Sequence, residues 1–209
     1  MPQRTDSGRA LFIPHHELKM LPDSIHKTFI FSKDSFINTS LVAEGSGDPG
    51  YEIRSTVTPR STKTRVIRNA TDVVTLTKRE WPRSNTLAFS GCSEMKMKNW
   101  LRDGSFTALQ SISDPSPTRY VWKTDAELGE LTLVRADTPD STAPLAIFRF
   151  AVHGRRSPTL HLTHEAEYFE DAIVASLLVI AHGIRIKTER QANRMAPDAL
   201  RMQPTTFGS

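Results

Sequence analysis

The feature that most constrains the fold is an apolar segment near the C-terminus. Between Ala172 and Ala181 the only polar residue is Ser176, so a helix formed there would be apolar on every side. Such a helix must be surrounded by lipid or by protein. A membrane-spanning helix needs about 20 apolar residues, and this run is roughly half as long before His182 ends it. We therefore expect no transmembrane span, and a helix that runs through the middle of a folded domain.

Short β-like segments precede this helix at close intervals. Tyr51–Val57 alternates apolar with polar residues, and residues 63–68 and 72–79 read as a hairpin. About twelve such segments follow one another up to Leu162, most of them separated by polar turns. Closure of so many strands leaves no sheet edge, and a helix fills a lumen too wide for side chains alone. The sequence therefore predicts a mainly β protein, a closed antiparallel β-barrel of about twelve strands around a buried apolar C-terminal α-helix.

The predicted organisation is one folded unit between two loose ends. A chain of 209 residues fits a single barrel domain. Residues 1–27 hold several prolines without a sustained helix or strand period, and we interpret them as an irregular N-terminal arm. Residues 28–190 form the predicted barrel with its central helix, and residues 191–209 form a C-terminal tail.

Cysteine content and the N-terminal sequence indicate in which cellular compartment the protein is expected. Cys92 is the only cysteine, so the fold does not rely on an internal disulfide, and we expect a small buried thiol. The N-terminus lacks the apolar core of a secretory signal. We therefore expect a cytoplasmic protein that is not secreted, with peripheral contact to a membrane left open.

Charge is distributed unevenly along the chain. Residues 51–102 hold eleven Lys or Arg against four Asp or Glu, whereas residues 103–182 hold six against eleven. A basic half of this kind can face an anionic partner, or simply coat the solvent face of a barrel. Trp100, Tyr120 and Trp122 are able to stack nucleic-acid bases, but aromatic residues in a barrel more often pack its core. Nucleic acid is therefore not an expected partner.

Several aromatic and aliphatic fragments occur in a suggestive order. They are Tyr51-x-Ile53, Trp81, Lys98-Asn-Trp-Leu101, Tyr120-Val-Trp-Lys123, Pro144-Leu-Ala-x-Phe148 and Asp171-x-Ile-Val-x-Ser-Leu-Leu178. Together they resemble a basidiomycete fungal family of unknown function in the tubby C-terminal-like superfamily, which includes LURP-one and phospholipid-scramblase-like proteins. The resemblance covers about residues 28–187. It implies a closed barrel around one apolar C-terminal helix.

The resemblance also implies a binding function. Tubby proteins bind phosphoinositides through a site that resembles a Lys-x-Arg pair on a strand, and this chain has Lys63 and Arg65 at that spacing. Period-two alternation places both on one strand face, where they can contact one phosphate. Arg68 lies close by, and a strand expected over residues 95–101 places Lys96 and Lys98 on one face as a second pair. Our leading hypothesis is a non-enzymatic module for anionic phospholipid headgroups, with these five residues as its site.

Two other functions stay open. A small-molecule-binding or enzymatic barrel would act at the barrel mouth, with His161, His164 and His182 as its candidate residues. A protein-interaction scaffold would use the acidic half. The sequence has no Gly-rich phosphate loop, His-Glu-x-x-His or paired-cysteine motif, so we expect no cofactor and no metal site, and favour binding over catalysis. His164 and Glu165 are interpreted as caps of the final helix.

Overall fold

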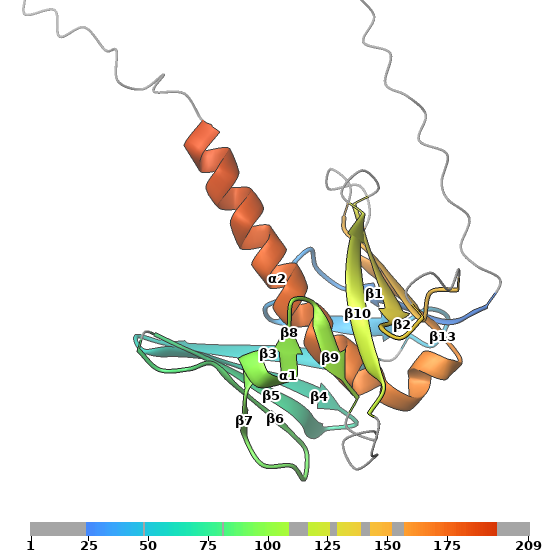
Figure 1. Ribbon diagram of the computed structural model, residues 1–209, viewed down its shortest axis with the longest axis horizontal. Coiled ribbons are helices and arrows are strands. Elements are labelled where there is room, and N and C mark those ends of the chain that lie inside the picture. Colours follow the sequence, from blue (N-terminus) through green and yellow to red (C-terminus); the bar gives the residue numbers. More distant parts are fainter. Residues whose placement is uncertain are drawn as a thin grey trace, which may run out of the picture.

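The structure is a large antiparallel β-sheet with one long C-terminal helix (Figure 1). It is a computed structural model that describes residues 24–47, 49–80, 82–108, 117–125, 129–138, 143–151 and 157–195, with side chains up to residue 186. Most of the predicted N-terminal arm, the end of the predicted tail and Trp81 lie outside the described residues. Strand β1 begins at Ile25 and the last helix continues to Met195, a few residues beyond the predicted 28–190 at each end.

Thirteen strands of the described chain belong to one sheet. Those of the first half are β1 (Ile25–Phe31), β2 (Thr39–Ala43), β3 (Pro49–Thr58), β4 (Ser61–Arg68), β5 (Thr71–Arg79), β6 (Thr86–Phe89) and β7 (Met95–Lys96). Those of the second half are β8 (Leu101–Arg102), β9 (Ser105–Thr107), β10 (Arg119–Asp125), β11 (Glu130–Arg135), β12 (Ala146–Arg149) and β13 (Thr159–Thr163).

The strand order follows the chain around the sheet. Strands β1 to β7 are consecutive neighbours, β8 to β13 are consecutive neighbours, and β1 pairs with β13. The two edge strands, β7 and β8, are connected by the short helix α1 (Met97–Trp100). Helix α1 therefore connects the two edges of the sheet. The described parts of β7 and β8 do not pair with each other. The predicted mainly β antiparallel class is confirmed.

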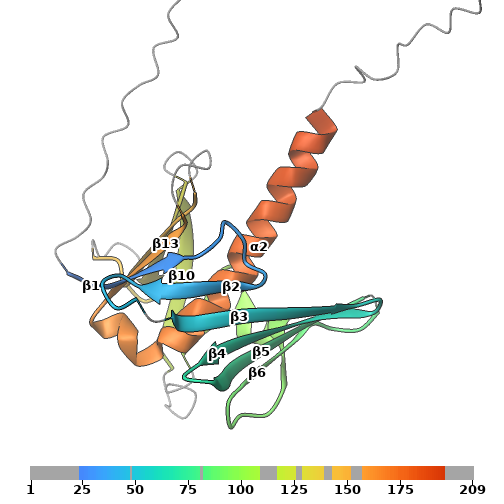
Figure 2. The same ribbon diagram turned by 180° about the vertical axis from the view of Figure 1, so that it is seen from behind.

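The long helix lies inside this sheet. It consists of a 3₁₀ turn, η2 (Glu165–Phe169), followed by α2 (Glu170–Met195). Figures 1 and 2 show α2 passing between strands β3–β6 and strands β10–β13, with its C-terminal part extending beyond the sheet. Every residue from Ala172 to Leu178 is buried, which agrees with the prediction of an apolar helix covered on all sides. None of the described helices combines the length with the apolar content that a membrane span requires.

The one polar side chain of the apolar run has a defined partner in the barrel wall. Ser176 is fully buried, and its hydroxyl accepts a hydrogen bond from the indole Nε1–H of Trp122 on β10 at 2.9 Å. The same hydroxyl donates to the carbonyl oxygen of Ile173 at 2.9 Å. Buried polar groups need such partners, because a group left unpaired keeps its full desolvation cost. This contact therefore links the buried part of α2 to strand β10 at one defined position.

Removal of the Ser176 hydroxyl should destabilise the protein through the unpaired indole. We expect Ser176→Ala to lower the free energy of unfolding by about 1–3 kcal/mol, measured by urea denaturation. In a Trp122→Phe background the same change should cost less than half as much, because no buried N–H is left without a partner. Equal costs in the two backgrounds would show that the hydrogen bond does not position the helix.

Candidate functional site

A pocket lies at the end of the barrel from which α2 leaves. Its volume is about 240 Å³, and it is bounded by α2, by the inner faces of β4 and β5, and by the β1–β2 loop. Most of its lining is apolar, namely Phe36, Ile37, Leu76, Met97, Leu178, Val179 and Ile186. We call it the mouth pocket. Mainly apolar walls with a few polar groups are typical of small-molecule sites.

The polar groups of the mouth pocket come mainly from strand alternation. Thr62 and Thr64 line it from β4, and Lys78 lines it from β5 two residues after Leu76. Thr62 pairs directly with Lys78 across the two strands, so both project from the inner face. Asn85 also lines the pocket, and its Oδ1 accepts a hydrogen bond at 2.9 Å from the backbone N–H of the residue after Lys78. None of the described lining residues is acidic.

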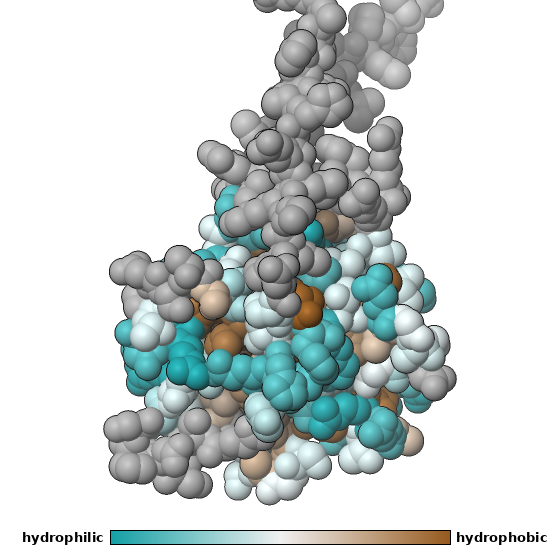
Figure 3. All heavy atoms as spheres, turned by 90° about the vertical axis from the view of Figure 1, so that its right-hand side faces the viewer, coloured by the Kyte–Doolittle hydropathy of each residue, from teal (hydrophilic) through white to brown (hydrophobic). Residues whose placement is uncertain are grey.

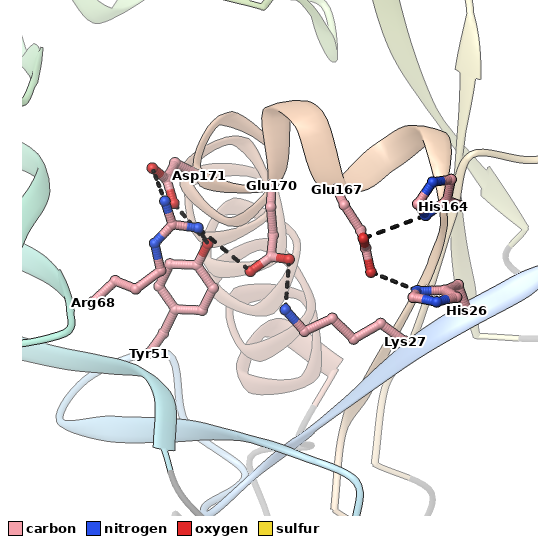
Figure 4. Close-up of polar contacts among 8 residues, drawn as sticks. All are labelled: His26, Lys27, Tyr51, Arg68, His164, Glu167, Glu170 and Asp171. Atoms are coloured by element: carbon pink, nitrogen blue, oxygen red, sulfur yellow. Dashed lines mark hydrogen bonds and ion pairs between the residues drawn. The ribbon is translucent and has the colours of Figure 1, made fainter. Parts of the chain in front are cut away.

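The opposite end of the barrel, where α2 starts, is occupied by a charged network (Figure 4). The Tyr51 hydroxyl donates to Asp171 Oδ1 at 2.6 Å, and Arg68 donates to Tyr51 Oη and Asp171 Oδ2, both at 3.3 Å. Lys27 Nζ lies 2.9 Å from Glu170 Oε2, and Glu170 is only 4% exposed. We call these five residues the helix-start cluster. Two carboxylates in the first turn also complement the helix dipole.

The helix-start cluster holds α2 to the sheet. Burial raises the pKa of Tyr51 far above its ordinary value, and the charges of Glu170 and Asp171 raise it further, so this hydroxyl stays protonated and can donate. Tyr51 is fully buried, with its ring against Phe29. A Cβ at Gly50 would lie 2.5 Å from the Phe29 ring, so glycine is needed for this packing. The paired charges and close packing indicate a structural role for this end of the barrel.

The predicted phosphate-binding residues are distributed over both faces of the sheet. Lys63 and Arg65 share the outer face of β4, opposite buried Val66. Arg65 Nη1 lies 3.7 Å from Asp72 Oδ2, so an acidic neighbour already opposes its charge. Arg68 lies on the other face, in the helix-start cluster. The structure therefore brings Lys63 and Arg65 together and places Arg68 apart from them.

The expected strand over residues 95–101 is wrong. Strand β7 ends at Lys96, Lys98 lies in helix α1, and the next strand, β8, begins at Leu101. Strand alternation therefore does not place Lys96 and Lys98 side by side, although both are exposed. Lys96 instead ends a cross-strand row that runs through Thr86 and Thr77 to Lys63. Three strand spacings, about 14 Å, separate the backbones of Lys63 and Lys96, so the two lysines do not form an adjacent pair.

The three candidate histidines lie in different places. His161 is buried on β13, where its ring nitrogens lie 3.0 Å from the hydroxyls of Thr28 and Thr159. His164 is exposed beside η2 at the helix-start end, and its side chain makes no capping hydrogen bond. His182 lines the mouth pocket at the other end of the buried helix. The structure therefore does not bring the three histidines into one site.

Two further expectations concern buried side chains. Trp100, Tyr120 and Trp122 all pack in the core, as expected for aromatic residues of a barrel. The expected burial of Cys92 is wrong, because this thiol is exposed. Gly91 adopts a φ of 74° in the turn after β6, and this turn carries Cys92 out of the sheet.

Surface composition bears on the scaffold hypothesis. The face shown in Figure 3 is mostly hydrophilic, and its hydrophobic side chains form small separate patches. The large exposed apolar side chains of the described residues belong to different elements, namely Ile30, Ile37, Val57 and Tyr168. Scattered apolar residues of this kind are ordinary on soluble surfaces, so they do not favour a protein partner.

Sequence reasoning missed Lys78 as a pocket residue. The signal was present, because Val74, Leu76 and Lys78 alternate on one face of β5. Their position beside the C-terminal part of α2 follows only from the sheet topology. The ion pair between Glu170 and Lys27 was also not predicted, because residues 1–27 were interpreted as an irregular arm.

Burial of His161 should make stability depend on pH. Burial, and then the nearby charge of Arg149, lower the pKa of His161 from 6.5 to about 4. Between pH 4 and pH 6.5 His161 is protonated in the unfolded chain and neutral in the folded chain. The free energy of unfolding therefore falls as the pH is lowered from 6.5 toward 4. Over this range the free energy of unfolding should fall more steeply in the wild-type protein than in His161→Gln. The difference between the two slopes should be at most about 1.4 kcal/mol per pH unit. Urea denaturation at several pH values tests this, and parallel profiles would contradict it.

Comparison with known proteins places the chain in a family. A family model described as a family of unknown function (DUF6593) matches residues 34–186. The match runs from the β1–β2 loop into α2 and includes the lining of the mouth pocket. No curated protein and no solved structure gives a significant match. A tubby-like relationship and a basidiomycete origin stay predictions, and the chain belongs to the family of unknown function DUF6593.

Proposed function

We propose that this protein is a binding module whose mouth pocket takes a small apolar molecule with an anionic group. The observation that supports this most directly is the combination of an apolar pocket of about 240 Å³ with Lys78 in its lining. Ligand pockets commonly range from about 300 to 1,000 Å³. The mouth pocket therefore fits one short chain or a small ring better than a whole phospholipid.

The apolar wall supplies the affinity in this proposal. Apolar surface removed from water contributes about 25 cal/mol per Å², and side chains from the helix, sheet and β1–β2 loop can enclose a ligand from several directions. Leu178 and Val179 of α2 face Leu76 of β5 across the pocket. The β1–β2 loop is tied to the helix where Arg185 Nη1 donates to the Asp34 carbonyl oxygen at 2.7 Å.

Lys78 supplies the preference for an anion. Its side chain is exposed to solvent and also lines the pocket, so its ammonium group can meet a ligand head at the opening. No acidic side chain is present among the described lining residues to compete for this charge. The hydroxyls of Thr62 and Thr64 can donate hydrogen bonds to the same head.

A matched pair of ligands tests the proposal. Octanoate and octanol share an apolar chain and differ in the charge of the head, so we expect octanoate to bind about fivefold tighter. Lys78→Met should remove this preference and retain octanol binding. Lys63→Met is the control, because it makes the same change on the neighbouring strand with the side chain on the outer face. Isothermal titration calorimetry at physiological salt measures both affinities.

A second variant locates the site. Gly183 lines the pocket from α2, and a Cβ added there meets no atom within 4 Å. Gly183→Phe should therefore fill the pocket without a clash in the core and abolish binding of both ligands. Undiminished binding in Gly183→Phe would place the site elsewhere, and no binding to the wild-type protein would refute the proposal.

Binding of anionic phospholipid headgroups is a second proposal. The supporting observation is that Lys63 and Arg65 share the outer face of β4, with Lys96 farther along the same face. The nearby acidic residues weigh against it, because Asp72 lies beside Arg65 and Glu52 forms hydrogen bonds of 2.6 and 2.8 Å with Arg54. Any such binding would depend on exposed charge and weaken as salt rises.

Co-sedimentation with liposomes tests this second proposal. Under it, phosphoinositide liposomes should bind the protein at low salt, neutral liposomes should not, and Lys63→Ala/Arg65→Ala should reduce binding at least fivefold. Arg83→Ala/Arg119→Ala is the control, because it removes the same charge from exposed positions outside this pair and outside the mouth pocket. Equal loss in the two double variants would indicate nonspecific attraction, and unaffected binding would exclude Lys63 and Arg65.

A further inference from the structure

Two histidines and a glutamate converge at the start of the C-terminal helix, beside the helix-start cluster (Figure 4). His26 Nδ1 lies 2.6 Å from Glu167 Oε1, and His164 Nδ1 lies 3.5 Å from Glu167 Oε2. The ring centroids of the two histidines are 5.1 Å apart. One potential ligand atom from each residue lies within 4.8 Å of the other two. We call these three residues the His–Glu cluster.

Two backbone features produce this convergence. The register of β1 against β13 shifts between Ile25, which pairs with Thr163, and Lys27, which pairs with Leu162. His26 is thus the extra residue of a β-bulge, a feature that redirects side chains and is common near functional sites. His164 directly follows β13, and Glu167 lies three residues later in the 3₁₀ turn. Side chains three residues apart in a 3₁₀ helix are eclipsed, so both point toward His26.

The charge balance of this region leaves one carboxylate for a metal ion. Of the four acidic side chains between residues 165 and 171, three face an Arg or Lys, in the pairs Arg135–Glu165, Lys27–Glu170 and Arg68–Asp171. The described partners of the Glu167 carboxylate are two imidazoles. An imidazole is neutral in its metal-binding form, so the cluster combines two neutral nitrogen donors with one negative oxygen donor.

We propose that His26, His164 and Glu167 bind a divalent transition-metal ion, with zinc as the best match. Two histidines and one carboxylate are a recognised zinc ligand set that leaves a fourth position for water or another ligand. Imidazole and carboxylate together also suit copper and nickel, and hard-cation sites for calcium or magnesium use oxygen ligands. This site lies outside the mouth pocket and does not depend on its function.

Only small movements are needed to form the site. Metal–ligand distances of about 2.1 Å in a tetrahedral arrangement separate ligand atoms by about 3.4 Å. His164 Nδ1 lies 3.5 Å from Glu167 Oε2, which already fits, and His26 Nδ1 lies 2.6 Å from the other oxygen, Oε1. A small rotation of the carboxylate or of the His26 ring would bring one atom of each residue, now within 4.8 Å of one another, to one ion. His26 and His164 are 58% and 70% exposed, so both rings are able to turn. The bound ion would connect β1 directly to the start of the helix.

Titration of the metal-stripped protein with zinc tests the proposal. We use His15→Ala/His16→Ala as the parent, because neighbouring histidines in the N-terminal sequence can bind metal on their own. Calorimetry at pH 7.5 should give one zinc per chain, and zinc should raise the melting temperature, since a ligand that binds the folded state stabilises it. His26→Ala, His164→Ala and Glu167→Gln should each weaken zinc binding at least tenfold.

The controls keep folding and binding apart. His182→Ala changes a histidine at the other end of the barrel and should leave zinc binding unchanged. Glu167→Gln retains the size of the side chain and removes its charge, and circular dichroism checks that each variant is folded. Absence of zinc binding by the parent, or undiminished binding in folded His26→Ala and His164→Ala, would overturn the proposal. Visible absorption of the cobalt-substituted protein distinguishes a tetrahedral site from a site in which water supplies most ligands.

Discussion

The apolar surface of α2 is the constraint on which the rest of the structure depends. From Ala172 to Leu178 the helix is buried on every side, and a sheet that covered one face would leave the remainder in water. Thirteen strands spaced about 4.8 Å apart span about 60 Å across the sheet, and bending that width into a ring gives a radius of about 10 Å, or somewhat more because barrel strands tilt. A helix with its side chains is about 10–12 Å wide. Thirteen strands therefore enclose one helix with room for one layer of side chains, and α1 completes the circuit where strand pairing stops.

The two ends of the barrel meet water in different ways. At the helix start, Glu170 and Asp171 directly precede the apolar run and form ion pairs with Lys27 and Arg68, respectively. Their charges are paired, and the Tyr51 hydroxyl donates to Asp171, so specific polar contacts hold this end together. At the other end the helix leaves the sheet, and the mouth pocket beside it has mainly apolar walls, with Lys78 among its few polar groups. Mainly apolar walls of this kind are suited to a ligand, and they are the basis for proposing a binding site at this end.

Local pattern predicted much of the fold and little of the site. The length and composition of the apolar run indicated a buried helix, and strand alternation placed Lys63 and Arg65 on one face. The strand expected over residues 95–101 is interrupted, because the two edges of the sheet lie there. The chain passes from one edge to the other through the helical turn α1. His26 and His164 are far apart in sequence and become neighbours through the pairing of β1 with β13 and a one-residue bulge. No local signal in the sequence specifies the pairing of β1 with β13 or the bulge at His26, so the sequence did not predict the His–Glu cluster.

Register is the link between the core and the mouth pocket. Lys63 pairs with Thr77, and the next residue of β5, Lys78, pairs with Thr62, so these lysines on adjacent strands face opposite sides of the sheet. A slip of one residue between β4 and β5 would exchange inner and outer side chains on the slipped strand. Pairing of buried Val66 with buried Val74 opposes such a slip, because it would turn apolar side chains into water. The packing that encloses α2 therefore also decides which lysine reaches the pocket and which faces outward.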